Sequence, residues 1–359
     1  MRKHISRFIV FLAVVSIELL LGGCTVHDSS VIQQADTMNT QLAPAVMNDA
    51  QLSNYLQSIG NRIIAVAKEM DAQHVGPETH FQENSQWMFA QSMKFHFVNS
   101  KTLNAFTTGG EHMYIYNALF QECQSEDELA AVMAHEYSHV YCRHVGQGMK
   151  RQYTALAAAA ALGGAGYVAG GKEHGSEYAA LGASAGAAGG QFLNMGFTRH
   201  DEDEADKYGF LFYTHAGWDP NHFGDFFKDM IAKGYDKTPA MLSDHPTLAS
   251  RVEATARRAG ELPANASSWR QPPIADVRQF AQLRARAAQL GKTMPDDSKL
   301  QNSQQLLAAL PRSCVAPEDP ADAVEARKAI STKAENASAS EQPGAPKKKK
   351  KPAPPPESP

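Results

Sequence analysis

The residues with the clearest capacity for chemistry lie at positions 135–139, which read His-Glu-Tyr-Ser-His. On a helix, residues four apart share a face, so His135 and His139 can offer imidazole nitrogens to one metal ion. Glu136 lies beside them and can act as a general base on a water that the metal activates. The alternative interpretation is a surface amphipathic helix that carries two histidines by chance.

The residues around this pentad predict that it lies within a helix. Ser125 has the side chain of an N-cap, and the acidic residues 126–128 suit the positive end of a helix dipole. Apolar residues then recur at helical spacing, namely Leu129, Val132, Met133 and Val140. We therefore expect a helix from about residue 126 to beyond residue 142.

A catalytic zinc site needs a third protein ligand, because such sites combine three side chains with one open position. The best source is the segment 199–209, which reads Arg-His-Asp-Glu-Asp-Glu-Ala-Asp-Lys-Tyr-Gly. On a helix Glu202 and Asp206 share a face, so one can bind the metal while the other accepts a hydrogen bond from a ligand imidazole. Taken without the pentad, the same acidic run would be a solvated helix face.

The two segments together resemble a known family. H-E-x-x-H at 135–139, followed about sixty residues later by R-x-x-E-x-E-A-D-x-x-G at 199–209, is similar to the gluzincin zinc metallopeptidases of the HtpX and CAAX-prenyl-protease type. Asn-Ala-Phe at 104–106, with Gly-Gly at 109–110, resembles the family's strand before the catalytic helix.

The resemblance extends to Ser-Asp-His-Pro at 243–246 with Arg251, which is similar to the family's H-P-x-x-x-x-R segment, and it covers about residues 50–260. It implies an α+β zincin fold of the gluzincin type. That fold would be mostly helical, with a small sheet whose edge strand precedes the H-E-x-x-H helix. The soluble periplasmic lipoprotein branch of the family is the expected relative.

The resemblance also implies roles for single residues. The family's metal-binding acid falls on Glu202, which becomes the third ligand of one Zn²⁺ per chain, with Asp206 as the partner of a ligand imidazole. His245 would lie near the metal, as a fourth ligand at rest or as an oxyanion donor, or else would be a helix-start histidine before proline. Arg251 would support the metal site or the oxyanion. The other central histidines are expected to be structural or on the surface, namely His144, His200, His215 and His222.

The first 24 residues have the pattern of a bacterial export signal. A basic start precedes an apolar run over residues 8–21 that is short for a membrane span. Leu-Gly-Gly-Cys at 21–24 resembles a lipobox, which implies cleavage after residue 23 and a lipid anchor on Cys24. Thr25 in place of aspartate is typical of lipoproteins of the outer membrane that face the periplasm. An uncleaved anchor is the alternative.

Periodicity and composition organise the rest of the chain. We expect a helix over 48–73 and strands over 93–98, 104–108 and 112–116. An exposed strand edge could hold an extended peptide across the metal, or the strands could form a plain structural hairpin. The expected segments are a signal over 1–23, a linker over 24–47, a catalytic domain over 48–314 with an Ala- and Gly-rich hairpin or lid at 154–191, and a disordered Pro- and Lys-rich tail over 315–359.

Three cysteines remain beside Cys24. If the helix is continuous, its rise of ~1.5 Å per residue separates Cys123 from Cys142 by roughly 20 Å or more. A disulfide joins Cα atoms within ~7 Å, so any bridge is expected to use Cys314 with one of them. A cysteine metal site is the alternative, although no C-x-x-C spacing supports it.

These features together predict a zinc-dependent endopeptidase of the bacterial cell envelope, which cleaves unfolded or misassembled envelope proteins and is held at the membrane by Cys24. The net charge is −4, and no basic stripe with interleaved aromatic residues indicates nucleic-acid binding. Two alternatives stay open. One is an outer-membrane assembly factor or chaperone with a mostly closed zinc site, and the other is a structural zinc protein.

Overall fold

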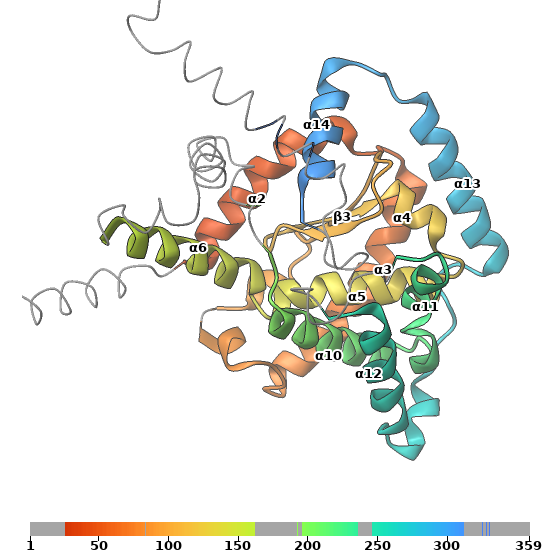
Figure 1. Ribbon diagram of the computed structural model, residues 1–359. Coiled ribbons are helices and arrows are strands. Elements are labelled where there is room, and N and C mark those ends of the chain that lie inside the picture. The colour runs from red at the N-terminus through yellow and green to blue at the C-terminus, as the bar shows by residue number, and fades with distance from the viewer. Residues whose placement is uncertain are drawn as a thin grey trace, which may run out of the picture.

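Figure 1 shows the computed structural model, which describes residues 26–82, 84–161, 192, 196–235, 246–311, 325, 328 and 330. Its helices are α2 (Asp28–Leu42), α3 (Ala50–Ala72), α4 (Asn117–Glu122), α5 (Glu126–Tyr141), α6 (His144–Ala161), α10 (Arg199–His215), α11 (Asp225–Ala232), α12 (Leu248–Gly260), α13 (Val277–Thr293) and α14 (Ser298–Ala309). The strands are β1 (Lys94–Val98), β2 (Ala105–Thr107) and β3 (His112–Tyr116). The predicted α+β class, mostly helical with a small sheet, is confirmed.

Several predicted features lie outside the described residues. They are the export signal over 1–23, Cys24, His245, Cys314 and the tail over 315–359 apart from three single positions. The predicted lid over 154–191 is described only as far as the end of α6 at Ala161. Within the described ranges, no helix is both long and apolar enough to cross a membrane.

The sheet has the strand order β1-β3-β2. β3 pairs in parallel with β1 and antiparallel with β2, with Phe97 opposite Ile115 on one side and Ala105 opposite Ile115 on the other. β2 is therefore an edge strand, and it precedes α5 in the chain with β3 and α4 between them. At the other edge, an isolated antiparallel bridge joins Val46 to Val98. The predicted strands and the structure agree to within one or two residues.

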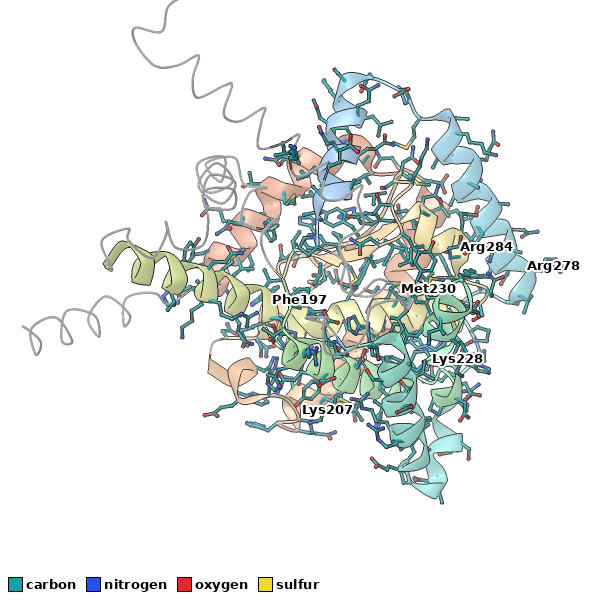
Figure 2. All side chains as sticks on the ribbon, viewed as in Figure 1. Phe197, Lys207, Lys228, Met230, Arg278 and Arg284 are labelled. Carbon is teal, nitrogen blue, oxygen red and sulfur yellow. The ribbon has the colours of Figure 1, made fainter. Side chains whose placement is uncertain are left out.

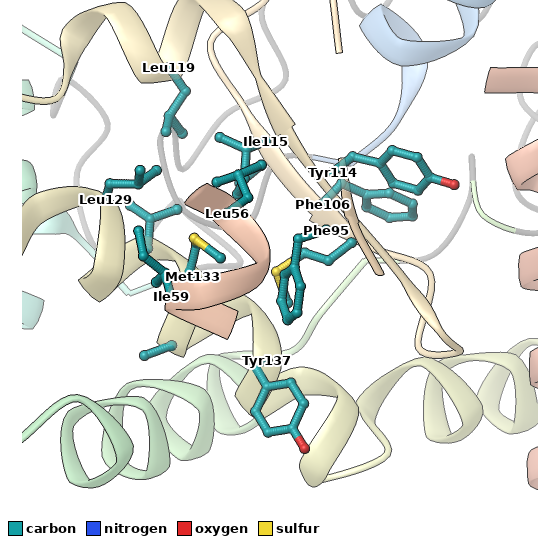
Figure 3. Close-up of a cluster of buried hydrophobic side chains, with 14 of the residues drawn as sticks. Leu56, Ile59, Phe95, Phe106, Tyr114, Ile115, Leu119, Leu129, Met133 and Tyr137 are labelled. Atoms are coloured by element: carbon teal, nitrogen blue, oxygen red, sulfur yellow. The ribbon is translucent and has the colours of Figure 1, made fainter. Parts of the chain in front are cut away.

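The core lies between the sheet and the helices α3 and α5. Asp49 caps α3 by accepting a hydrogen bond from the backbone N–H of Leu52 at 3.0 Å. Figure 3 shows apolar side chains from these elements in one cluster, which includes Leu56 and Ile59 of α3, Phe95, Phe106 and Ile115 of the sheet, and Leu129 and Met133 of α5. Full burial of each such side chain contributes about 1.5–3 kcal/mol. Gly60 permits the close approach of α3 to β1, because a Cβ there would collide with the Phe95 ring.

The helix α5 is buried along nearly its whole length, between the sheet and α10 (Figure 1). Most of its apolar residues belong to the core, and His135 on its other side contacts Asp206 of α10. Cys123 precedes α5 and Cys142 caps its C-terminus, and both are buried free thiols. The expectation that these two cysteines do not bond to each other is confirmed.

The predicted linker over 24–47 contains α2, which packs on the domain. Its buried face comprises Val31, Ala35, Met38 and Leu42. Arg143, just after α5, binds the Asp28 carboxylate through Nε at 3.0 Å and Nη2 at 2.9 Å. Such a bidentate pair fixes the geometry at both ends, so α2 is tied to the turn between α5 and α6.

Candidate metal centre

The helix that carries the pentad is held at its N-terminus by buried polar contacts. Ser125 accepts a hydrogen bond from the backbone N–H of Glu128 at 3.3 Å. The Glu126 carboxylate accepts hydrogen bonds from the Trp218 indole at 3.0 Å and from the backbone N–H of Ile274 at 2.7 Å. Trp218 follows α10 and Ile274 precedes α13, so a shift of α5 along its axis would break hydrogen bonds to both segments.

The two histidines of the pentad lie one turn apart on α5, and their rings meet edge to face with planes inclined by 78°. The Nε2 atoms of His135 and His139 are 3.1 Å apart. Glu202 of α10 places Oε2 3.4 Å from Nε2 of His135. The donor atoms of these three residues lie within 4.8 Å of one another, and all three side chains are buried. The structure therefore brings together three possible metal ligands from two helices.

The position of Glu202 depends on how α10 begins and how closely it packs. Thr198 and Asp201 form a capping box, in which each side chain accepts a hydrogen bond from the other's backbone N–H. Gly209 lies against α5, where a Cβ would come within 3.0 Å of the backbone N and Cα of His135. The final glycine of the 199–209 motif thus lets α10 approach α5 closely enough for its acids to reach the histidines.

Asp206 orients the His135 ring. Its Oδ1 lies 2.9 Å from Nδ1 of His135, and Arg251 of α12 donates to both carboxylate oxygens at 2.6 and 2.8 Å. Burial alone would raise the pKa of Asp206, but Arg251 and His135 outweigh it and hold the pKa well below its usual range. The ionised carboxylate fixes the His135 proton on Nδ1. Arg251 also lies 3.0 Å from that nitrogen, and we assign its donors to Asp206 because the carboxylate carries the charge.

The His139 ring is held from a different direction. Its Nδ1 lies 2.9 Å from Nδ1 of His144, and Nε2 of His144 lies 3.2 Å from Oε2 of Glu204. Phe197 stacks on the ring of His139, with centroids 3.9 Å apart and planes inclined by 20°; Figure 2 labels this residue near α5 and α10. His144 reaches His139 because Arg143 has φ = 57°, which turns the chain sharply between α5 and α6.

Two of the three donor separations match those around a zinc ion. Zinc–nitrogen bonds of 2.0–2.1 Å in a tetrahedral arrangement place neighbouring donors about 3.3 Å apart. The His135–His139 and His135–Glu202 separations of 3.1 and 3.4 Å lie on either side of that value. Since Asp206 keeps the His135 proton on Nδ1, the Nε2 lone pair is turned toward the other two donors. Two imidazoles and one carboxylate are also the ligand types that catalytic zinc sites use.

The remaining predicted residues are placed as follows. Glu136 is fully buried in α5 beside His135, and Arg251 lies on α12 in contact with Asp206. His245 and Cys24 lie outside the described residues. Sequence reasoning missed His144, which it assigned to the fold or the surface, and it gave no role to Glu204 or Phe197. The available signal was that the 199–209 run holds more acids than one ligand and one partner require.

An H-E-x-x-H helix that faces a glutamate from a second helix, beside a small sheet, defines a metallopeptidase domain of the zincin type. The family model of peptidase family M48 matches residues 51–259, and the chain belongs to this family. The predicted metallopeptidase family is thereby confirmed.

Comparison of the sequence with individual proteins supports the same assignment. The chain is 32% identical over 222 residues to a putative beta-barrel assembly-enhancing protease of Vibrio cholerae, covering 61% of this chain and 41% of that protein. It is 27% identical over 294 residues to the beta-barrel assembly-enhancing protease of Escherichia coli K12, covering 80% and 56%. A mitochondrial metalloendopeptidase OMA1 of Schizosaccharomyces pombe is 30% identical over 169 residues, covering 44% of each chain. The chain thus spans about half the length of the curated relatives it matches.

Proposed function

We propose that this protein is a zinc-dependent endopeptidase. The observation that supports this most directly is the convergence of His135, His139 and Glu202, whose donor atoms lie within 4.8 Å of one another in the buried interior. Glu136 is adjacent in sequence and is also buried. A structural zinc site would need no such carboxylate beside it, whereas hydrolysis needs a base.

Each residue of the site has a role in the proposed reaction. His135, His139 and Glu202 would hold one zinc ion, which, when bound, polarises the peptide carbonyl and lowers the pKa of water. Glu136 takes a proton from the attacking water and passes it to the leaving amine. Asp206 and Arg251 keep His135 in the correct tautomer and orientation.

His245 is proposed to act near the metal, either as a fourth ligand at rest or as a donor to the oxyanion. Its place in the chain supports this role. Pro246 follows it directly, Thr247 caps α12, and α12 carries Arg251 into contact with Asp206. The segment that contains His245 therefore joins a helix already anchored to the metal site.

The proposed substrates are unfolded or misassembled proteins of the bacterial envelope. Two relatives are named beta-barrel assembly-enhancing proteases, which supports an envelope substrate. The sheet adds no support for binding of extended chains by strand addition, because the residues of its edge strand β2, Ala105, Phe106 and Thr107, are buried. The same proposal includes a lipid anchor on Cys24 and a location at the outer membrane, facing the periplasm. It also keeps the predicted segments, which are a signal over 1–23, a linker over 24–47, a catalytic domain over 48–314 and a tail over 315–359.

The Glu136→Gln variant tests the proposed reaction. Glutamine has nearly the same shape but cannot accept the proton, so peptide cleavage should be abolished while zinc remains bound. Cleavage of an unfolded casein substrate and the zinc content should be measured side by side for the variant and the wild type. Turnover by Glu136→Gln at the wild-type rate would remove the general-base role. If neither the wild type nor any variant cleaves the substrate although zinc is bound, the site is structural.

A second candidate is an assembly factor or chaperone with a gated zinc site, and the names of the relatives favour it. In that case His245 would close the site, and cleavage would appear or rise in His245→Ala. A fall in cleavage in that variant would instead assign His245 to catalysis.

A further inference from the structure

The two imidazoles of the metal centre both receive support from acids of α10, but by different routes. Asp206 contacts Nδ1 of His135 directly at 2.9 Å. Glu204, two residues earlier on the same helix, lies 3.2 Å from Nε2 of His144, whose Nδ1 lies 2.9 Å from Nδ1 of His139. A second imidazole therefore spans the distance between an acid of α10 and the second ligand.

The positions of the protons in this chain follow from simple counting. A neutral imidazole has one N–H, and metal binding through Nε2 of His139 leaves that proton on Nδ1. At 2.9 Å, Nδ1 of His144 must then accept the hydrogen bond. The single proton of His144 consequently lies on Nε2, where Oε2 of Glu204 accepts it at 3.2 Å. Each of the two hydrogen bonds, from His139 to His144 and from His144 to Glu204, therefore has one donor and one acceptor.

We propose that His144, oriented by Glu204, is a positioning residue that fixes the tautomer and the ring orientation of the metal ligand His139. This inference rests on the proposed zinc site and assigns His144 no contact with substrate. A hydrogen bond that the second nitrogen of a ligand imidazole donates to an acceptor raises the basicity of the ring and keeps the lone pair of the other nitrogen on the metal. Phe197, stacked on the same ring, restricts the ring plane, while His144 decides which nitrogen carries the proton.

A second metal site at the same place is the competing interpretation, because donor atoms of Cys142, His144 and Glu204 also lie within 4.8 Å of one another. The proton count opposes it. If Nε2 of both His139 and His144 bound metals, one proton would be shared by the two Nδ1 atoms and one ring would be an imidazolate. Burial also raises the pKa of the Cys142 thiol well above its usual value, so the thiolate ligand is disfavoured.

Zinc affinity provides the first test. In competition with a chelator, His144→Leu should bind zinc about 10–100-fold more weakly than the wild type, since loss of such an outer partner has effects of that size. His144→Asn places an amide oxygen where Nδ1 lies, so it should retain more affinity than His144→Leu. A purely structural role would give the two variants equal affinity. Thermal unfolding of both variants reports any damage to the fold.

The chain offers a matched control for the acid. Glu204 has two histidine neighbours, the buried His144 at 3.2 Å and the exposed His200 at 3.7 Å. Glu204→Leu should weaken zinc binding, whereas His200→Gln should leave it unchanged, because His200 has no contact with His139 in the described structure. Equal losses in Glu204→Leu and His200→Gln would show a general charge effect and overturn the proposed chain.

A spectroscopic test needs no substitution in the chain. In the zinc-loaded wild type, ¹⁵N NMR of the histidine rings should show the proton of His139 on Nδ1 and that of His144 on Nε2. A proton on Nδ1 of His144, or two zinc ions per chain by mass spectrometry, would refute the inference. A wild type that binds no zinc would instead contradict the proposed function, so the two failures are distinguishable.

Discussion

The two metal-facing histidines lie four residues apart on one helix, yet their surroundings differ. On the His135 side, Asp206 is buried and contacts the ring directly, and Arg251 neutralises it from α12. On the His139 side, Glu204 keeps 21% of its side chain exposed and acts through His144. A fully buried carboxylate needs a countercharge, whereas a partly exposed one is stabilised by water. The difference in burial therefore explains why, among the described residues, Asp206 is paired with an arginine and Glu204 is not.

We expect the largest loss of unfolding free energy when the countercharge on the His135 side, Arg251, is removed. Arg251→Ala would leave the buried Asp206 without its cation, and breaking a buried pair from one side costs about 3–5 kcal/mol. Denaturant unfolding of the zinc-free protein would measure the loss. Arg257→Ala, at an exposed position on the same helix, is the control and should change the unfolding free energy little. If Arg251→Ala lowers the unfolding free energy by less than about 1 kcal/mol, as expected for a surface pair, Asp206 does not depend on a buried countercharge.

The next effect concerns the packing that delivers both acids. Gly209→Ala would place a Cβ 3.0 Å from the backbone of His135 and push α10 away from α5. Overpacking of this kind costs about 1–3 kcal/mol, and zinc affinity should fall because Glu202 and Asp206 move with the helix. Gly260→Ala has open space around its Cβ and should be neutral or slightly stabilising. Unchanged zinc affinity in Gly209→Ala would mean that the helix contact does not set the ligand geometry.

Another buried carboxylate, that of Glu128, tests the role of the countercharge. Glu128 of α5 has Asp225 and Asp229 among its neighbours, and burial raises its pKa to about 7. The folded protein therefore holds this proton more tightly than the unfolded chain, so stability should fall as pH rises from about 4.5 to about 7.

Glu128→Gln should remove that decline and make the protein more stable than the wild type at pH 8. The unfolding free energy as a function of pH would show it, with Glu253→Gln at an exposed position as the control. If Glu128→Gln and the wild type have parallel profiles between pH 4.5 and 7, burial does not perturb this acid.

Much of the fold and part of the candidate site could be predicted because the signals are local. The spacing of His135 and His139, the Ser125 cap and the alternation over 94–98 each depend on a few consecutive residues. The acid pair Glu202 and Asp206 follows from helical periodicity once a third ligand is required. Helical periodicity does not distinguish the two acids, and Glu202 is assigned as the ligand from the resemblance to the zinc metallopeptidase family.

The support around His139 could not be predicted because it depends on how three segments meet. His144 turns back onto His139 only because Arg143 adopts a positive φ, and Phe197 covers the ring from the segment before α10. Glu204 faces this group because the capping box and the Gly209 contact fix the rotation and depth of α10. No spacing in the sequence encodes these contacts between segments, so His144 resembled an ordinary structural histidine.

The central claim is that Glu202, and not a neighbouring acid, completes a site for one zinc ion with His135 and His139. Zinc per chain, measured by mass spectrometry on Glu202→Ala and Glu204→Ala purified alongside the wild type, tests it most directly. We expect one zinc in the wild type, little or none in Glu202→Ala, and one more weakly held zinc in Glu204→Ala. Full zinc occupancy in Glu202→Ala, together with loss in Glu204→Ala, would contradict the account.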